Sequence, residues 1–157
     1  MTPAINAAKK ARIEFRIHEY EHDSAAQSFG QEAAQKLGLP AQRVFKTLVL
    51  QADNQSLAIA VVPVDGQLNL KLMAKALAVK KVQMAEKSQA ERSTGYVLGG
   101  ISPLGQKKNL ATVIDCSAQK FASIFVSAGR RGLEIELCAQ SLAQLTRAKF
   151  ADIARIG

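Results

Sequence analysis

Two apolar stretches decide the fold of this chain: RVFKTLVLQ at residues 43–51 and LAIAVVP at residues 57–63. Both are rich in the β-branched and large apolar residues that favour strands. The polar turn Asp53-Asn54-Gln55 lies between them, so together they predict a β-hairpin. Because apolar residues occupy both faces of the first stretch, we expect this strand in the interior of a sheet.

The flanking sequence adds short helices and short strands in an irregular order. Helices are expected over residues 3–11, 32–37, 70–79 and 141–147, with a helical turn at 88–92. Further strands are expected at residues 13–17, 81–84, 112–115, 124–127 and 133–137, and a last apolar element at 150–156. This mixture predicts a single α+β domain over residues 1–157, with helices packed outside a curved, barrel-like mixed sheet.

The composition is that of an ordinary globular protein, with 48% hydrophobic and 22% charged residues. No run of about 18 uncharged apolar residues occurs, which argues against a membrane span. The start Met1-Thr2-Pro3-Ala4 lacks the layout of a signal peptide, so we expect a cytoplasmic protein. Cys116 and Cys138 have no CxxC partner, which fits reduced thiols.

The chain is strongly basic. It carries 21 Lys and Arg against 13 Asp and Glu, a net charge of +8, and its pI is about 9.7. The basic residues recur in small clusters rather than in a tail: Lys9-Lys10-Arg12, Lys71 with Lys75, Lys80-Lys81, Lys107-Lys108 and Arg130-Arg131. Such clusters form either a face that attracts phosphates or a merely basic solvated surface.

Lys46 interrupts the first apolar stretch. On a strand it shares a face with Leu48 and Leu50, where an unpaired lysine is rarely buried. Its ammonium group therefore either reaches past the sheet edge, the commoner arrangement, or projects into a polar cavity. In a cavity it could hold a phosphate or polarise an ester carbonyl.

A glycine-rich loop, Gly99-Gly100-Ile101-Ser102-Pro103-Leu104-Gly105, is the second feature with chemical potential. Ser102 is disfavoured as a nucleophile, because Pro103 has no N–H to donate to an oxyanion. The residues after Gly105 also lack the Gly-Lys-Ser/Thr ending of a nucleotide-binding P-loop. The loop is thus either a tight structural turn, the commoner case, or a set of backbone N–H groups that cradle an anion.

The two histidines, His18 and His22, are spaced as metal ligands would be on a helix. Here they lie on extended chain, where four residues span roughly 13 Å, too far for one ion. No third ligand is evident, so we expect neither a metal nor an organic cofactor.

At these residues the chain resembles the YbaK/EbsC family of bacterial aminoacyl-tRNA deacylases, which clear Cys-tRNA(Pro). The resemblance covers nearly the whole chain. It rests on residues 1–4, His22-Asp23, Phe29-Gly30, Phe45-Lys46-Thr47-Leu48, Ser93-Thr94-Gly95-Tyr96, residues 99–108 and residues 126–133. It implies the barrel-like mixed sheet found in the editing domain of many prolyl-tRNA synthetases.

The resemblance also implies a site. Lys46 would be the principal functional residue and would hold the substrate near its terminal adenosine. The expected substrate-binding residues are Tyr20, Phe29, Thr47, Gly99, Gly100, Ile101, Ser102, Ser127, Gly129 and Glu134. Glu134 falls where related proteins carry other residues, such as Asp or Ser.

The implied mechanism needs no nucleophile from the protein. The thiol of the mischarged cysteine attacks its own ester carbonyl and forms a thiolactone, which releases the tRNA. Such an attack within one molecule has a large effective molarity once the geometry is held. The implied partners are the aminoacylated 3′ end of tRNA, whose affinity should fall with salt, and prolyl-tRNA synthetase, which would supply tRNA specificity.

Two other functions stay open at this stage. The first is a deacylase for another small amino acid such as alanine, which has no thiol and would need an ordered water. The second is a non-enzymatic module that binds tRNA or a synthetase, because a shared fold does not establish a shared reaction.

Overall fold

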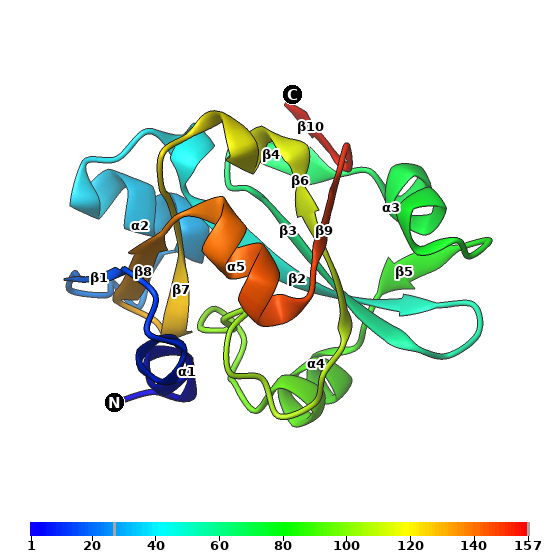
Figure 1. Cartoon of the computed structure of the whole chain (residues 1–157), viewed down its shortest axis with the longest axis horizontal. Helices are drawn as coiled ribbons and strands as arrows, with labels where there is room; N and C mark the ends of the chain where they lie inside the picture. The colour runs from blue at the N-terminus through cyan, green and yellow to red at the C-terminus, as the bar shows by residue number, and fades with distance from the viewer. Residues whose placement is uncertain (27, 157) are drawn as a thin grey trace.

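The predicted hairpin forms the centre of the largest sheet in the computed structural model, which describes residues 1–26 and 28–156 (Figure 1). Its strands β2 (Phe45–Ala52) and β3 (Leu57–Pro63) pair antiparallel. On the β3 side the sheet continues in parallel with β6 (Ala111–Asp115) and β9 (Lys149–Ala151). On the other side β5 (Val82–Met84) pairs antiparallel with β2, which gives the order β5-β2-β3-β6-β9.

A second sheet lies beside the start of β2. It has the antiparallel order β1-β8-β7, formed by β1 (Arg16–Glu19), β7 (Ile124–Arg130) and β8 (Leu133–Leu137). A bridge between Val44 and Phe125 links it to the chain just before β2. A third, two-stranded sheet pairs β4 (Gly66–Leu68) with β10 (Ala154–Ile156). The α+β class and the mixed sheet are confirmed, but the strands of the described residues form separate sheets and not a closed barrel.

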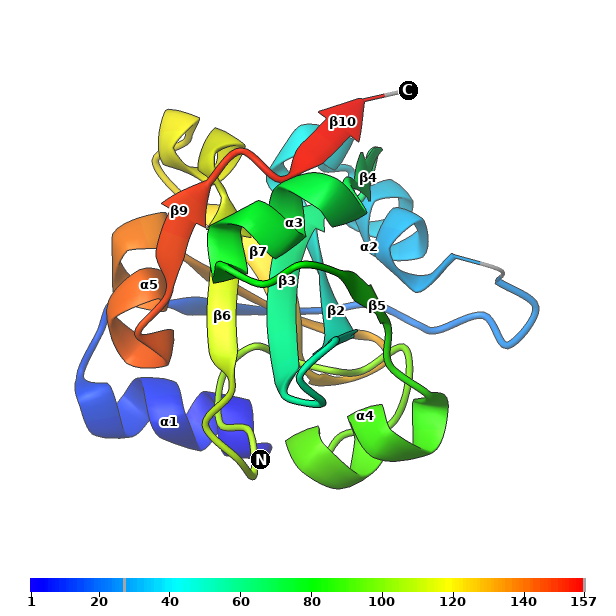
Figure 2. The same cartoon turned by 90° about the vertical axis from the view of Figure 1, so that its right-hand side faces the viewer.

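Both faces of β2 are buried, as the apolar pattern predicts. Phe45 and Val49 join a core with α1 (Pro3–Ala11), α4 (Lys87–Thr94) and α5 (Ala139–Thr146). Leu50 packs in a second core on the opposite face, under α3 (Leu70–Leu77), which crosses that face in Figure 2. A third, smaller cluster lies under α2 (Phe29–Leu37). Two short 3₁₀ turns complete the chain, η1 (Ala41–Arg43) and η2 (Cys116–Lys120).

Several predicted boundaries differ from the structure. The strand expected at residues 13–17 forms only from Arg16, and Ile17 on it is 36% exposed. The alternation is misleading here because β1 is an edge strand whose apolar neighbours Ile13 and Phe15 pack on the core before the strand begins. Helix α2 begins at Phe29, three residues earlier than predicted, and ends as predicted at Gly38, whose φ is +67°.

The two sides of β2 are covered unequally, and this positions the site. β3 pairs with β2 from Phe45 to Gln51, whereas β5 pairs with it only from Leu50 to Ala52. The first half of β2 is therefore an edge on the β5 side, and it contains Lys46. No helix of the described residues is long and apolar enough to cross a membrane.

Candidate active site

A cavity of about 330 Å³ opens against this edge of β2. Three other parts of the chain complete it: the start of α2, the loop at residues 98–101 and the β1-β8-β7 sheet. Its lining consists of Tyr20, Ser28, Phe29, Gly30, Phe45, Lys46, Thr47, Leu48, Leu98, Gly99, Ile101, Ser127 and Glu134. Eight of the predicted site residues thus meet in one place: Lys46, Tyr20, Phe29, Thr47, Gly99, Ile101, Ser127 and Glu134.

Lys46 is the cationic group of this lining. Burial lowers its pKa, and the Asp65 carboxylate partly offsets this effect. No carboxylate of the described residues lies within ion-pair distance of its ammonium group. Lys46 therefore lines the cavity, as in the second of the two arrangements considered for it, and its charge is available to a ligand.

Two acidic side chains, Tyr20 and Glu134, also line the cavity. Burial raises the pKa of Glu134 to about 8, and burial together with the nearby Glu134 raises the pKa of Tyr20 to about 12. The phenol is therefore neutral at physiological pH, and the carboxyl is largely protonated in the empty cavity. Thr47 Oγ1 is also buried here without a hydrogen-bond partner among the described residues.

Arg131 and Phe29 stack on each other at the rim of the cavity. The Arg131 guanidinium lies over the Phe29 ring, 4.4 Å from its centroid, and donates to the Leu98 carbonyl at 2.6 and 3.1 Å. Gly99 fits against both side chains: a Cβ at this position would lie 2.6 Å from Arg131 Nε and 2.8 Å from the Phe29 ring. Its φ of +88° also favours glycine.

Each of the two histidines contacts the carboxylate of a glutamate. His22 Nδ1 is 2.8 Å from Glu32 Oε1, and the Asp23 N–H donates to the other Glu32 oxygen at 2.7 Å. These contacts fix the chain next to Phe29, whose ring also packs against the His22 ring. His18 Nε2 lies 2.9 Å from a different residue, Glu136. The two histidines thus contact two different carboxylates.

Three predicted site residues lie behind the cavity wall rather than in its lining: Gly100, Ser102 and Gly129. Gly100 packs on the backbone of Arg130, and a Cβ there would lie 2.8 Å from Arg130 Cα. Ser102 is fully buried, and its Oγ accepts the Leu104 N–H at 3.2 Å. The Gly129 N–H donates to Ser127 Oγ at 3.2 Å. The contacts of these three residues are thus with neighbouring parts of the protein.

The glycine loop is both a structural turn and a possible cradle. Its far end packs on α1, since a Cβ on Gly105 would lie 2.5 Å from the Pro3 backbone. At its near end the Gly100 N–H donates to the Val97 carbonyl at 2.9 Å. The N–H groups of Gly99 and Ile101 have no acceptor among residues 1–26 and 28–156, so both could donate to an oxyanion.

Five residues of the lining were not predicted as site residues: Ser28, Gly30, Phe45, Leu48 and Leu98. Phe45 and Leu48 flank Lys46 and Thr47 in the same stretch, which was an available signal. Gly30 allows α2 to approach the sheet closely, because a Cβ there would lie 2.4 Å from Val64 Cγ1. Nothing in the local pattern around Ser28 or Leu98 indicates that they face a cavity.

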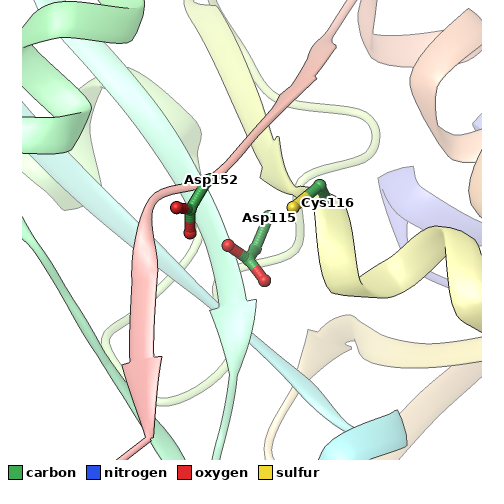
Figure 3. A group of neighbouring side chains, drawn as sticks. All are labelled: Asp115, Cys116 and Asp152. Carbon is green, nitrogen blue, oxygen red and sulfur yellow. The ribbon is translucent and has the colours of Figure 1, made fainter.

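One other cluster of possible metal ligands lies at the end of β6, where Asp115, Cys116 and Asp152 come within 4.8 Å of one another (Figure 3). Asp115 accepts the N–H groups of Ile153 and Ala154, each at 3.0 Å, and Asp152 pairs with an arginine. These contacts fasten the connection between β9 and β10 to β6. Cys116 and Cys138 are both free thiols.

The sequence is similar to those of known proteins. Residues 23–145 match the aminoacyl-tRNA editing domain family. Over 97% of its length the chain is 36% identical to an Enterococcus faecalis protein named as a candidate Cys-tRNA(Pro)/Cys-tRNA(Cys) deacylase, EbsC, 92% of which is covered. It is also 29% identical over 139 residues to a proline–tRNA ligase of Geobacter metallireducens, matching 83% of this chain and 24% of the ligase.

The fold has a solved counterpart as well. A candidate trans-editing enzyme for prolyl tRNA synthetase superposes with a TM-score of 0.82 at 19% identity, with 99% of each chain covered. The chain thus shares its fold with this solved protein. This chain belongs to the aminoacyl-tRNA editing domain family.

Proposed function

We propose that this protein is a trans-editing deacylase that clears mischarged Cys-tRNA(Pro), and that its cavity holds the cysteinyl end of the tRNA. Family membership and the 36% identical relative support the reaction class and the substrate. The observation that carries the site is the cavity at the edge of β2, whose lining includes both part of the glycine loop and an ammonium group without an ion-pair partner among the described residues.

The lining favours a nucleophile supplied by the substrate. Among the described residues, no hydrogen bond joins a hydroxyl of the lining to a histidine or a carboxylate, so none has the activating base that a catalytic hydroxyl needs. In the proposed step the cysteine sulfur bonds to its own ester carbonyl, while the thiol proton leaves to solvent. The bond from that carbon to the ribose oxygen then breaks, and the ribose oxygen takes up a proton.

The protein would orient the ester and stabilise the oxyanion that forms in this step. Lys46 and the N–H groups of Gly99 and Ile101 are the candidate donors. The exposed basic residues near the rim, Arg130 and Arg131, would attract the tRNA backbone.

Deacylation of Cys-tRNA(Pro) under single-turnover conditions tests this function. We expect the wild type to release cysteine well above the uncatalysed rate and Lys46→Ala to lose roughly 100-fold or more of this rate, as when an oxyanion donor is removed. Lys75→Ala, an exposed lysine on α3, is the matched control and should behave as the wild type. Full activity in Lys46→Ala would contradict the site, and no deacylation by the wild type would contradict the function.

We also propose that prolyl-tRNA synthetase supplies the tRNA selectivity. Clustered positive charge attracts any phosphate backbone but reads no bases. The proline–tRNA ligase relatives, which contain a matching segment, support this partner. In the same assay, kcat/KM for Cys-tRNA(Pro) is therefore expected to rise when the synthetase is added, and an unchanged value would contradict the partnership.

A further inference from the structure

The carboxyl group of Glu134 is buried at the cavity wall without a partner. Strand β8 is the central strand of its sheet, and Glu134 pairs across it with His18 on β1 and Ser127 on β7. The residue is 6% exposed and lines the cavity. No hydrogen bond or ion pair connects its side chain to any described residue. Unlike Thr47 Oγ1, its carboxyl oxygens are not fully enclosed, so they are open to a group that binds in the cavity.

Glu136, a second glutamate on β8, has the side-chain partners that Glu134 lacks. Glu136 lies two residues further along β8 and hence on the same face. Its carboxylate contacts His18 at 2.9 Å, Ser123 at 2.5 Å and Arg43 at 3.7 Å. The strand therefore supplies partners to one carboxylate and leaves the other facing the empty cavity.

No cationic side chain of the described residues forms an ion pair with Glu134. Tyr20, which follows β1, is the acidic side chain beside it, and its phenol is neutral. The ring of His18 is turned to Glu136, and the ring of His22 to Glu32. Lys46 on β2 lies in the same cavity but beyond ion-pair distance, and the carboxylate that acts on it is Asp65. The cavity lining thus carries an ammonium group, Lys46, and a carboxyl group, Glu134, that do not form an ion pair with each other.

A bound aminoacyl ester has matching charges. It carries an α-ammonium group next to an ester carbonyl that becomes negative during the reaction. We propose that Glu134 binds the α-ammonium group of the aminoacyl ester and thereby restricts the cavity to substrates with a free amine. This inference rests on the proposed deacylase function. It implies that N-blocked esters, such as peptidyl-tRNA, are spared, and that the Cα of the substrate is held in one orientation between its two charged contacts.

Replacing the substrate amine tests this directly. The two substrates are cysteinyl-tRNA(Pro) and its α-hydroxy analogue, which keeps the thiol and has a hydroxyl of similar size in place of the amine. Each kcat/KM is divided by the uncatalysed rate of the same ester, which removes the intrinsic difference in reactivity. We expect the wild type to prefer the amine by roughly 10- to 100-fold, as for a hydrogen bond between charged groups.

Two variants test which residue causes the preference for the amine substrate. Glu134→Gln should bring the ratio of the two substrates close to one, because it slows the amine substrate alone. Glu136→Gln, on the same strand face, should keep the wild-type ratio. A wild-type ratio near one would overturn the inference, as would an unchanged preference in Glu134→Gln. Absence of catalysed cleavage of both esters would instead contradict the deacylase function itself.

A binding measurement on the wild type gives a second test that needs no variant. Ionisation of Glu134 on binding should release close to one proton per bound ligand at pH 7, because its pKa is about 8 in the empty cavity. The probes are non-hydrolysable 3′-amide analogues of aminoacyl-adenosine with an α-amine or an α-hydroxyl. Proton release with the amine probe alone supports the inference, and equal release with both probes overturns it.

Discussion

Lys46 is partly buried and Glu134 is buried, and the sequence indicates the two ionisable residues to different degrees. Lys46 stands out because a charge interrupts an apolar strand, so a single stretch of nine residues is enough to identify it. Glu134 has no such local signal. Its burial depends on pairing with β1, more than 100 residues earlier in the chain, and on the cavity that this pairing helps to enclose. The local pattern therefore draws attention to Lys46 without deciding between a sheet edge and a cavity, whereas the environment of Glu134 requires the fold.

The raised pKa of Glu134 predicts how stability depends on pH. The folded state, with a pKa of about 8, keeps a proton that the unfolded state loses near 4.5. The stability of the wild type should therefore fall as pH rises from about 4.5 to 8, by a few kcal/mol at most. Glu134→Gln should lack this fall in urea unfolding at several pH values.

Glu136→Gln is a control, because Glu136 should affect the pH dependence of stability in the opposite direction. Although burial acts to raise it, the pKa of Glu136 is lowered by hydrogen bonds from Ser123 and His18. Its carboxylate thus contributes stability above the unfolded pKa, and this contribution disappears in acid. The cost of Glu136→Gln should accordingly shrink as pH falls below about 4. A wild-type stability that rises between pH 5 and 8 in step with Glu134→Gln would contradict the assignment for Glu134.

At the scale of elements, the rim of the cavity depends on a contact between the glycine loop and α2. Both elements were expected from the sequence, but their meeting at Phe29 was not, because the predicted helix began three residues too late. The hairpin of β2 and β3 was predicted well, since its apolar pattern and turn agree. The pattern around β1 was misleading, since edge position and not alternation decides which of its side chains are exposed.

Gly99→Ala should damage the rim. An alanine at φ +88° costs about 1–2 kcal/mol of backbone free energy, and its Cβ would also press on Phe29 and Arg131. We expect a lower unfolding midpoint together with a several-fold loss of kcat/KM for Cys-tRNA(Pro).

Gly38→Ala is the matched control. Its φ of +67° imposes a similar backbone penalty, but nothing lies within 4 Å of the added Cβ, and the residue is at the far end of α2. It should lose stability and keep activity. Equal kcat/KM values for the two variants would show that the rim contact does not matter for the substrate.

At the scale of the whole molecule, the cavity joins segments that are far apart in the chain: the residues around Tyr20, the start of α2, the edge of β2, the glycine loop and strands β7 and β8. The α+β class followed from the mixture of short elements. The separation into three sheets did not, because the sequence pattern contains no information on which short strands pair over long distances. The assembled cavity offers charges and backbone donors that can orient an ester, while the thiol of the substrate would supply the attacking group.

Blocking the thiol of the substrate tests whether the substrate itself supplies the attacking group. Single-turnover deacylation is measured for Cys-tRNA(Pro), for the same tRNA with the cysteine thiol alkylated, and for Ser-tRNA(Pro), whose hydroxyl is similar in size to the thiol but far less nucleophilic. If the thiol attacks, we expect rapid loss of cysteine from the first substrate and rates near the uncatalysed value for the other two. Unchanged turnover of the thiol-blocked substrate would contradict this mechanism.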